Sequence, residues 1–157
     1  MRRTPAGKGG QKTVATLPNE SSFTTRIRMT GSARYQVLYT GGSFDAHWFE
    51  PSRTTVRVRV SRNLRGQIVE RDGGARYIGR VTPGWTRKPV TIQRKTCRTC
   101  AWRTYATVRT DGKGRYAVAV TAPDKGSWFW RSAVRATRPR FVAGHGNVWR
   151  TFRPPAA

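Results

Sequence analysis

Acidic residues are scarce in this sequence. Its 157 residues include only 7 Asp and Glu against 31 Lys and Arg, so the formal net charge is +24. No pair of acids is spaced to act as general acid and general base. No Ser-His-Asp or Cys-His set has motif support either, so we expect no enzymatic activity and no catalytic residue. The acids are Glu20, Asp45, Glu50, Glu70, Asp72, Asp111 and Asp124.

Long apolar runs are also absent. No stretch approaches the roughly 18 apolar residues of a membrane-spanning helix. The basic start, MRRTPAGKGG, is not followed by the apolar core of a signal peptide. We therefore expect no membrane span. The chain is expected either to be a piece of a longer exported or cell-surface protein or, alternatively, to be cytoplasmic.

The chain has only two cysteines, Cys97 and Cys100, in a C-x-x-C spacing between two expected strands. This spacing fits a disulfide across a hairpin tip, which we predict for an exported protein. A zinc site would need His47 and His145 as further ligands, but each lies in a different part of the chain. A redox dithiol would need a following helix, which the pattern does not predict. The remaining alternative is a pair of free thiols. We expect no metal site and no cofactor.

Arginine dominates the basic residues, since only six of the 31 are lysine. The guanidinium fork suits carboxylates and phosphates, and so large a positive charge predicts affinity for polyanions. The arginines are spread along the chain rather than gathered at one end. The candidates for anion binding are those that alternate with apolar residues in expected strands: Arg57, Arg59, Arg131 and Arg135.

A two-residue alternation of apolar and polar side chains recurs along the chain and predicts β-strands. Gly-rich turn signals such as TGG, RDGG and TDGKG separate the segments. Short antiparallel strands at this spacing predict a β-sandwich or barrel. The expected strands are 24–29, 35–39, 54–60, 77–81, 88–94, 102–110, 115–122, 128–136 and 148–152.

The same alternation predicts which side chains form the core. Tyr116, Val118 and Val120 share one face, and Gly112 or Gly114 supplies the positive-φ residue of the preceding turn. In 128–136 the apolar face is the expected core wall, and Arg131 and Arg135 lie on the opposite, wet face. The residues of that wall are Trp128, Trp130, Ser132, Val134 and Ala136.

The domain organisation follows from two similar strand–loop–strand stretches, 32–58 and 127–152. Only the second is preceded by hairpins, which indicates the tail of one β-unit followed by a whole one, with a seam near 61–66. We expect residues 1–20 to be a disordered basic arm or linker, 21–62 a partial β-unit, 63–153 the complete domain, and 154–157 a tail.

Several motifs resemble the Ig-like β-sandwich repeats of actinobacterial secreted and cell-surface proteins. The carrying stretches are GRVTPGWTRKPVTIQR, the strand opened by Trp102, TDGKGRYAVAV and WFWRSAVRAT, with YQVLYTGGSF fitting a preceding repeat. The resemblance covers about 79–152 well and about 22–60 loosely. It implies an all-β, antiparallel Ig-like sandwich with additional N-terminal strands from a partial second unit.

Two functions are compatible with these features. The first is a non-catalytic Ig-like spacer or binding module, with an anionic cell-wall or matrix polymer as partner. The second is a basic nucleic-acid-binding β protein, including a small virion coat protein. In this second case the arm 1–13 would grip phosphates, and Trp48 or Trp85 would stack on bases. Oligomeric state does not follow from the sequence.

Overall fold

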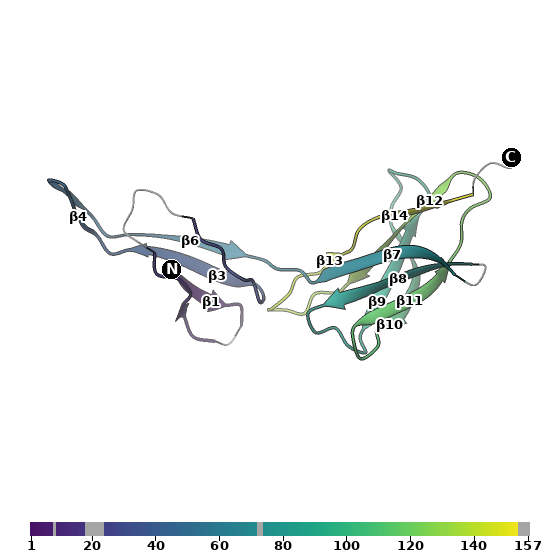
Figure 1. Ribbon diagram of the computed structural model, residues 1–157, viewed down its shortest axis with the longest axis horizontal. Helices are drawn as coiled ribbons and strands as arrows, with labels where there is room; N and C mark the ends of the chain where they lie inside the picture. The colour runs from purple at the N-terminus through teal and green to yellow at the C-terminus, as the bar shows by residue number, and fades with distance from the viewer. Residues whose placement is uncertain (8, 18–23, 72–73, 154–157) are drawn as a thin grey trace. The chain divides into compact units, whose positions relative to one another are not determined.

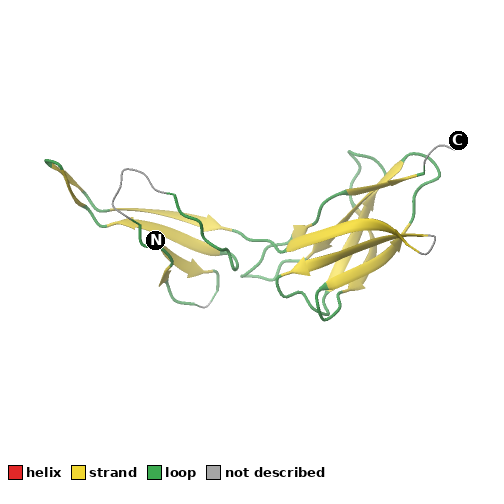
Figure 2. Cartoon of the chain, in the orientation of Figure 1, coloured by secondary structure: helices red, strands yellow, loops and turns green. Residues whose placement is uncertain are grey.

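The computed structural model describes residues 1–7, 9–17, 24–71 and 74–153, which form strands, turns and irregular segments (Figures 1 and 2). Within these ranges no residue is helical, and every pair of named strands is antiparallel. The predicted all-β, antiparallel fold class is therefore confirmed. The chain divides into two compact units, Met1–Ser61 with Thr137–Val142 and Arg62–Ala136 with Ala143–Ala157.

The second unit consists of two antiparallel sheets. One has the strand order β11-β8-β7, and the other has the order β10-β9-β12, where β12 also pairs with β13 and β14. The strands of the first sheet are β7 (Asn63–Arg71), β8 (Gly74–Thr82) and β11 (Arg115–Val120). Those of the other are β9 (Pro89–Lys95), β10 (Arg103–Arg109), β12 (Ser127–Val134), β13 (Gly144–His145) and β14 (Trp149–Phe152).

The core of this unit lies between its two sheets. Tyr77 and Tyr116 come from the three-stranded sheet, and Ile92 and Trp130 come from the other, all in one buried cluster. Trp85, from the β8–β9 connection, belongs to the same cluster. Burying these large apolar surfaces is the main stabilising term of such a sandwich. Leu64, Val81, Val90, Val120 and Val134 complete the cluster.

The predicted core faces of β11 and β12 are largely confirmed. Tyr116 and Val120 are buried, and Trp130 and Ser132 are fully buried. Gly114 has φ +75°, so it is the positive-φ residue of the turn before β11. Ala136 was expected in the core wall but is exposed, because β12 ends at Val134.

Two strand predictions were wrong. The expected strand at 24–29 is irregular, although its residues alternate as a strand would. Conversely, β7 occupies Asn63–Arg71, where the sequence was interpreted as a seam, and pairs along its whole length with β8. Gly66 interrupts the apolar alternation of β7 because the Tyr77 and Tyr116 hydroxyls would lie only 2.8 and 2.9 Å from a Cβ there.

The first unit contains a four-stranded sheet of order β2-β1-β3-β6 and the hairpin β4-β5. Residues 1–20 were expected to be a disordered basic arm or linker. Among the described residues of this range, β1 pairs with β3, since backbone hydrogen bonding requires no apolar pattern in the added strand. The strands are β1 (Arg2–Pro5), β2 (Lys12–Thr13), β3 (Ala33–Tyr39), β4 (Gly42–Phe44), β5 (His47–Phe49) and β6 (Ser52–Val58).

The segment Thr137–Val142 belongs to the first unit although it follows β12 of the second. The Ser32 amide donates to the Arg140 carbonyl at 2.7 Å, and Phe141 is buried, as are Ala33 and Tyr35. Local sequence gave no signal for this return. The division between Ser61 and Arg62 lies close to the predicted seam. The expected tail, 154–157, lies outside the described residues.

Candidate anion-binding site

The structure places the predicted Arg57 and Arg59 in the first unit. Arg57 is exposed on β6 and directly opposite Arg34 of β3. Arg59 is exposed and lies beyond the end of β6. Arg57 therefore belongs to a pair of register-matched arginines, whereas Arg59 has no equivalent position in the sheet.

Arg131 of the second unit packs against Trp102 and Gln93. Its guanidinium carbon lies 4.3 Å from the centroid of the Trp102 ring, and its Nε donates to the Gln93 side-chain oxygen at 2.8 Å. Burial lowers the pKa of Arg131. Arg135 is exposed beyond the end of β12. On the face of β12 that carries Arg131, Phe129 is paired in register with Arg150 of β14 and Lys95 of β9.

A different set of arginines forms a row across the three-stranded sheet of the second unit. Arg80 on β8 is paired in register with Arg65 on β7 and with Arg115 on β11. Residues paired in an antiparallel sheet project from the same face, and all three are exposed. We call Arg65, Arg80 and Arg115 the arginine row.

The arginine row lines a shallow groove of about 790 Å³. Arg109, at the end of β10, adds a fourth guanidinium group to its wall. Arg80 is oriented by a hydrogen bond from its Nε to the Lys113 carbonyl at 3.0 Å, and Arg109 by one from Nη1 to the Arg87 carbonyl at 3.1 Å. Each bond uses one of the five N–H donors of a guanidinium group.

Asp111 is the one acid among the groove-lining residues, and its carboxylate is used locally. Its Oδ1 accepts hydrogen bonds from the amides of Arg115 at 2.8 Å and Lys113 at 2.7 Å. These bonds, that from Arg115 foremost, lower the pKa of Asp111. Asp111 thus shapes the turn that positions Arg115, and the groove keeps a strong excess of positive charge.

The adjacent row of paired residues is Gln67, Ile78 and Ala117, which also lines the groove. The row of arginines therefore runs beside a row with one amide and two apolar side chains. Tyr116 is the only aromatic residue of the lining, and it is 4 % exposed. The groove offers charge and a narrow apolar strip, but no exposed aromatic face.

The arginine row could not be predicted from the sequence because strand register is a tertiary property. Arg65 lies in a strand that was not predicted, and Arg80 and Arg115 lie 35 residues apart in sequence. A prediction of the β7–β8 hairpin would have brought Arg65 beside Arg80. The pairing with Arg115 requires the longer β8–β11 connection.

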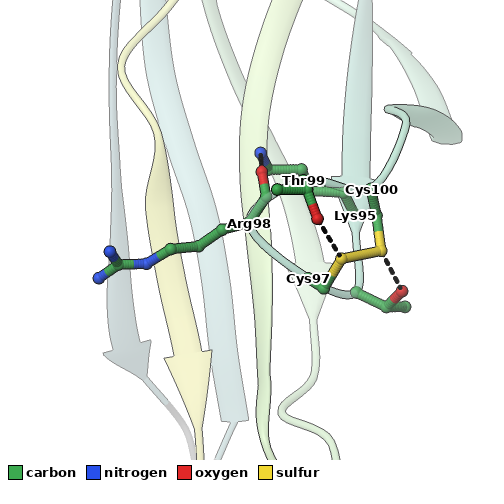
Figure 3. Close-up of a disulfide and its surroundings, with 6 residues drawn as sticks. Lys95, Cys97, Arg98, Thr99 and Cys100 are labelled. Atoms are coloured by element: carbon green, nitrogen blue, oxygen red, sulfur yellow. Dashed lines mark hydrogen bonds between the residues drawn. A yellow bond between two sulfur atoms is a disulfide. The ribbon is translucent and has the colours of Figure 1, made fainter.

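The predicted cysteine pair forms a disulfide at the tip of the β9–β10 hairpin, with the two Cα atoms 5.1 Å apart (Figure 3). The Thr96 hydroxyl donates to the sulfur of Cys100, and the Thr99 hydroxyl lies 3.5 Å from the sulfur of Cys97. His47 is on β5 of the first unit and His145 on β13 of the second. Among the described residues no three His, Cys, Asp or Glu side chains gather as metal ligands.

Comparison with known proteins gives no relative: no family model, curated protein or solved structure matches the chain. In the described part of the chain, no helix has the length and apolar character needed to cross a membrane.

Proposed function

We propose that this chain is a non-catalytic binding module that holds an anionic polymer on the arginine row. The observation that carries the proposal is the register of Arg65, Arg80 and Arg115. Like charges directly opposite one another destabilise a sheet. A row of three like charges is therefore a cost to folding that a bound polyanion would remove.

We also propose that the second unit is an Ig-like sandwich and that the protein is exported or displayed at the cell surface. The strand orders β11-β8-β7 and β10-β9-β12-β14 support this proposal of an Ig-like sandwich, in a variant in which β10 pairs with β9 rather than with β11. The disulfide supports an oxidising environment, as expected of an exported or cell-surface protein. The polymer would then belong to a cell wall or extracellular matrix.

Two variants on β8 test the site. Arg80→Gln and Arg76→Gln remove the same charge from the same strand, but Arg76 pairs with Val69 and Ala119 rather than with arginines. We expect Arg80→Gln to weaken binding to immobilised polygalacturonate and polyphosphate about tenfold, because a charge-assisted contact is lost. Arg76→Gln should change the affinity less than about twofold.

The measurement is the dissociation constant at several salt concentrations by biolayer interferometry. Equal effects of the two variants would show that net charge alone binds the polymer, and would contradict the proposal. Random duplex DNA and single-stranded RNA serve as competitors. Tight nucleic-acid binding with a steep salt dependence, unaffected by Arg80→Gln, would favour the nucleic-acid alternative instead.

A further inference from the structure

The geometry points to a linear acidic polysaccharide with one anionic group on each sugar, lying across the strands β7, β8 and β11; we propose this class of ligand for the arginine row. The inference rests on the proposed function and specifies its ligand. Three features of the groove support it: the spacing of the charges, the row beside them, and the absence of an exposed aromatic face.

The charges are spaced by the sheet itself. Arg65, Arg80 and Arg115 are paired in register across three adjacent strands. The backbones that carry neighbouring arginines are therefore about 4.8 Å apart, which is the spacing between strands of a sheet. A polymer whose anionic groups recur at about this interval on one side can therefore place them on successive arginines, running perpendicular to the strands.

The second row fits the body of such a chain. Gln67, Ile78 and Ala117 lie on the next register line of the same face, and all three line the groove. Ile78 and Ala117 offer an apolar surface to the C–H groups of a sugar ring, and the Gln67 amide can bond a hydroxyl. A polyphosphate has no ring to place there.

The lining also argues against single-stranded nucleic acid. Proteins that bind single-stranded nucleic acid without sequence preference stack its bases on exposed aromatic side chains. Tyr116 is the only aromatic residue of the groove wall, and its ring is buried against Tyr77, with the two centroids 6.1 Å apart. Bases brought to this groove would find no exposed ring, whereas uronate carboxylates would find forked guanidinium donors.

The test uses the intact chain and oligogalacturonides of two to six sugars, with isothermal titration calorimetry as the measurement. We expect the affinity to rise about tenfold between the disaccharide and the tetrasaccharide, as the third arginine is engaged, and then to level off. Affinity that keeps rising in proportion to chain length would show diffuse charge attraction and would overturn the inference.

A pair of uncharged substitutions separates sugar recognition from anion binding. Ile78→Thr removes apolar surface from the second row, whereas Val69→Thr makes the corresponding change at a position outside the groove lining. We expect Ile78→Thr to weaken tetragalacturonate binding about fourfold and to leave polyphosphate binding unchanged. Val69→Thr should change neither.

The outcomes distinguish the two levels of the proposal. If polyphosphate, single-stranded DNA and oligogalacturonide bind equally well per charge and Ile78→Thr affects none of them, the saccharide inference fails while the anionic-polymer function stands. If none of these ligands binds more weakly to Arg80→Gln than to Arg76→Gln, both fail.

Discussion

Arg80 shows how one residue can be unfavourable for folding and suited to binding. It lies between Arg65 and Arg115 on the same face of a sheet. Cross-strand pairs contribute roughly 0.2–1 kcal/mol each, and like charges make the contribution unfavourable. Such a conflict between local rule and fold is typical of functional positions.

We therefore predict that Arg80→Gln stabilises the second unit at low ionic strength, by up to about 1 kcal/mol. Arg76→Gln, which has no arginine neighbours in register, should have a smaller effect. Denaturant unfolding in 10 mM and 500 mM salt measures both, and the difference should shrink at high salt because exposed charges are screened. A loss of stability in Arg80→Gln at low salt would contradict this account.

Gly79 illustrates a residue fixed by close approach. A Cβ at this position would lie 2.3 Å from the Tyr116 hydroxyl oxygen and 2.5 Å from the backbone oxygen of Arg65. The second contact is to backbone and cannot be relieved by a rotamer change.

We predict that Gly79→Ala lowers the free energy of unfolding by about 1–3 kcal/mol, as overpacking of a core does. Gly74, on the same strand, is the matched control, since a Cβ there would meet only the Arg71 carbonyl oxygen at 4.0 Å. Gly74→Ala should be neutral or slightly stabilising. Thermal and denaturant unfolding compare the two variants, and similar losses in both would refute the packing explanation.

At the scale of the element, the β9–β10 hairpin has a disulfide at its tip and buried core residues in its strand β9. Val90 and Ile92 of β9 are fully buried, whereas Cys97 and Cys100 lie at the half-exposed tip. Lys95 donates to the Arg98 carbonyl and adds a second constraint on the same turn. The disulfide therefore acts on the tip, and the ladder beneath it is held by the core.

Reduction of the disulfide should lower the free energy of unfolding by less than about 2 kcal/mol, because closing so short a loop removes little entropy from the unfolded chain. Trp130→Ala should cost about 3–5 kcal/mol as a reference for loss of core packing. Hydrogen exchange after reduction should rise at 96–101 and stay low in β9. Unfolding of the whole hairpin on reduction would show that the disulfide is needed for the domain to fold, and would contradict this prediction.

At the scale of the whole molecule, the two units differ in the size of their cores. The second has ten buried hydrophobic residues in one cluster. The buried hydrophobic residues described for the first are Ala33, Tyr35 and Phe141. Since burial of apolar area dominates stability, the first unit has much less to hold it.

We predict two unfolding transitions, with the first unit unfolding at lower denaturant. Tyr35→Ala should shift the earlier transition, and Trp130→Ala should shift the later one. Tryptophan fluorescence combined with native-state hydrogen exchange assigns each transition to its residues. A single transition that both variants shift equally would mean that the units unfold as one.

The sequence predicted the chemical type of the candidate site but not its residues. The excess of arginine pointed to an anionic partner, but the chosen residues were those with the clearest local alternation. Arg131 illustrates the limit, since alternation placed it on the solvent-facing side of β12 but did not predict that its guanidinium group stacks on Trp102. Arg65 was missed because Gly66 breaks the pattern of β7 at the point where two tyrosines need space.

By itself the sequence determined that the chain is built of antiparallel strands, that β11 and β12 bury the faces they do, and that its two cysteines can meet at a hairpin tip. Each of these follows from side-chain periodicity or turn chemistry, which act over a few residues. Only the tertiary structure decided that three arginines share one register line and that Thr137–Val142 returns to the first unit. Such pairings depend on which distant strands become neighbours, and that choice is made by the packing of the whole core rather than by any local segment.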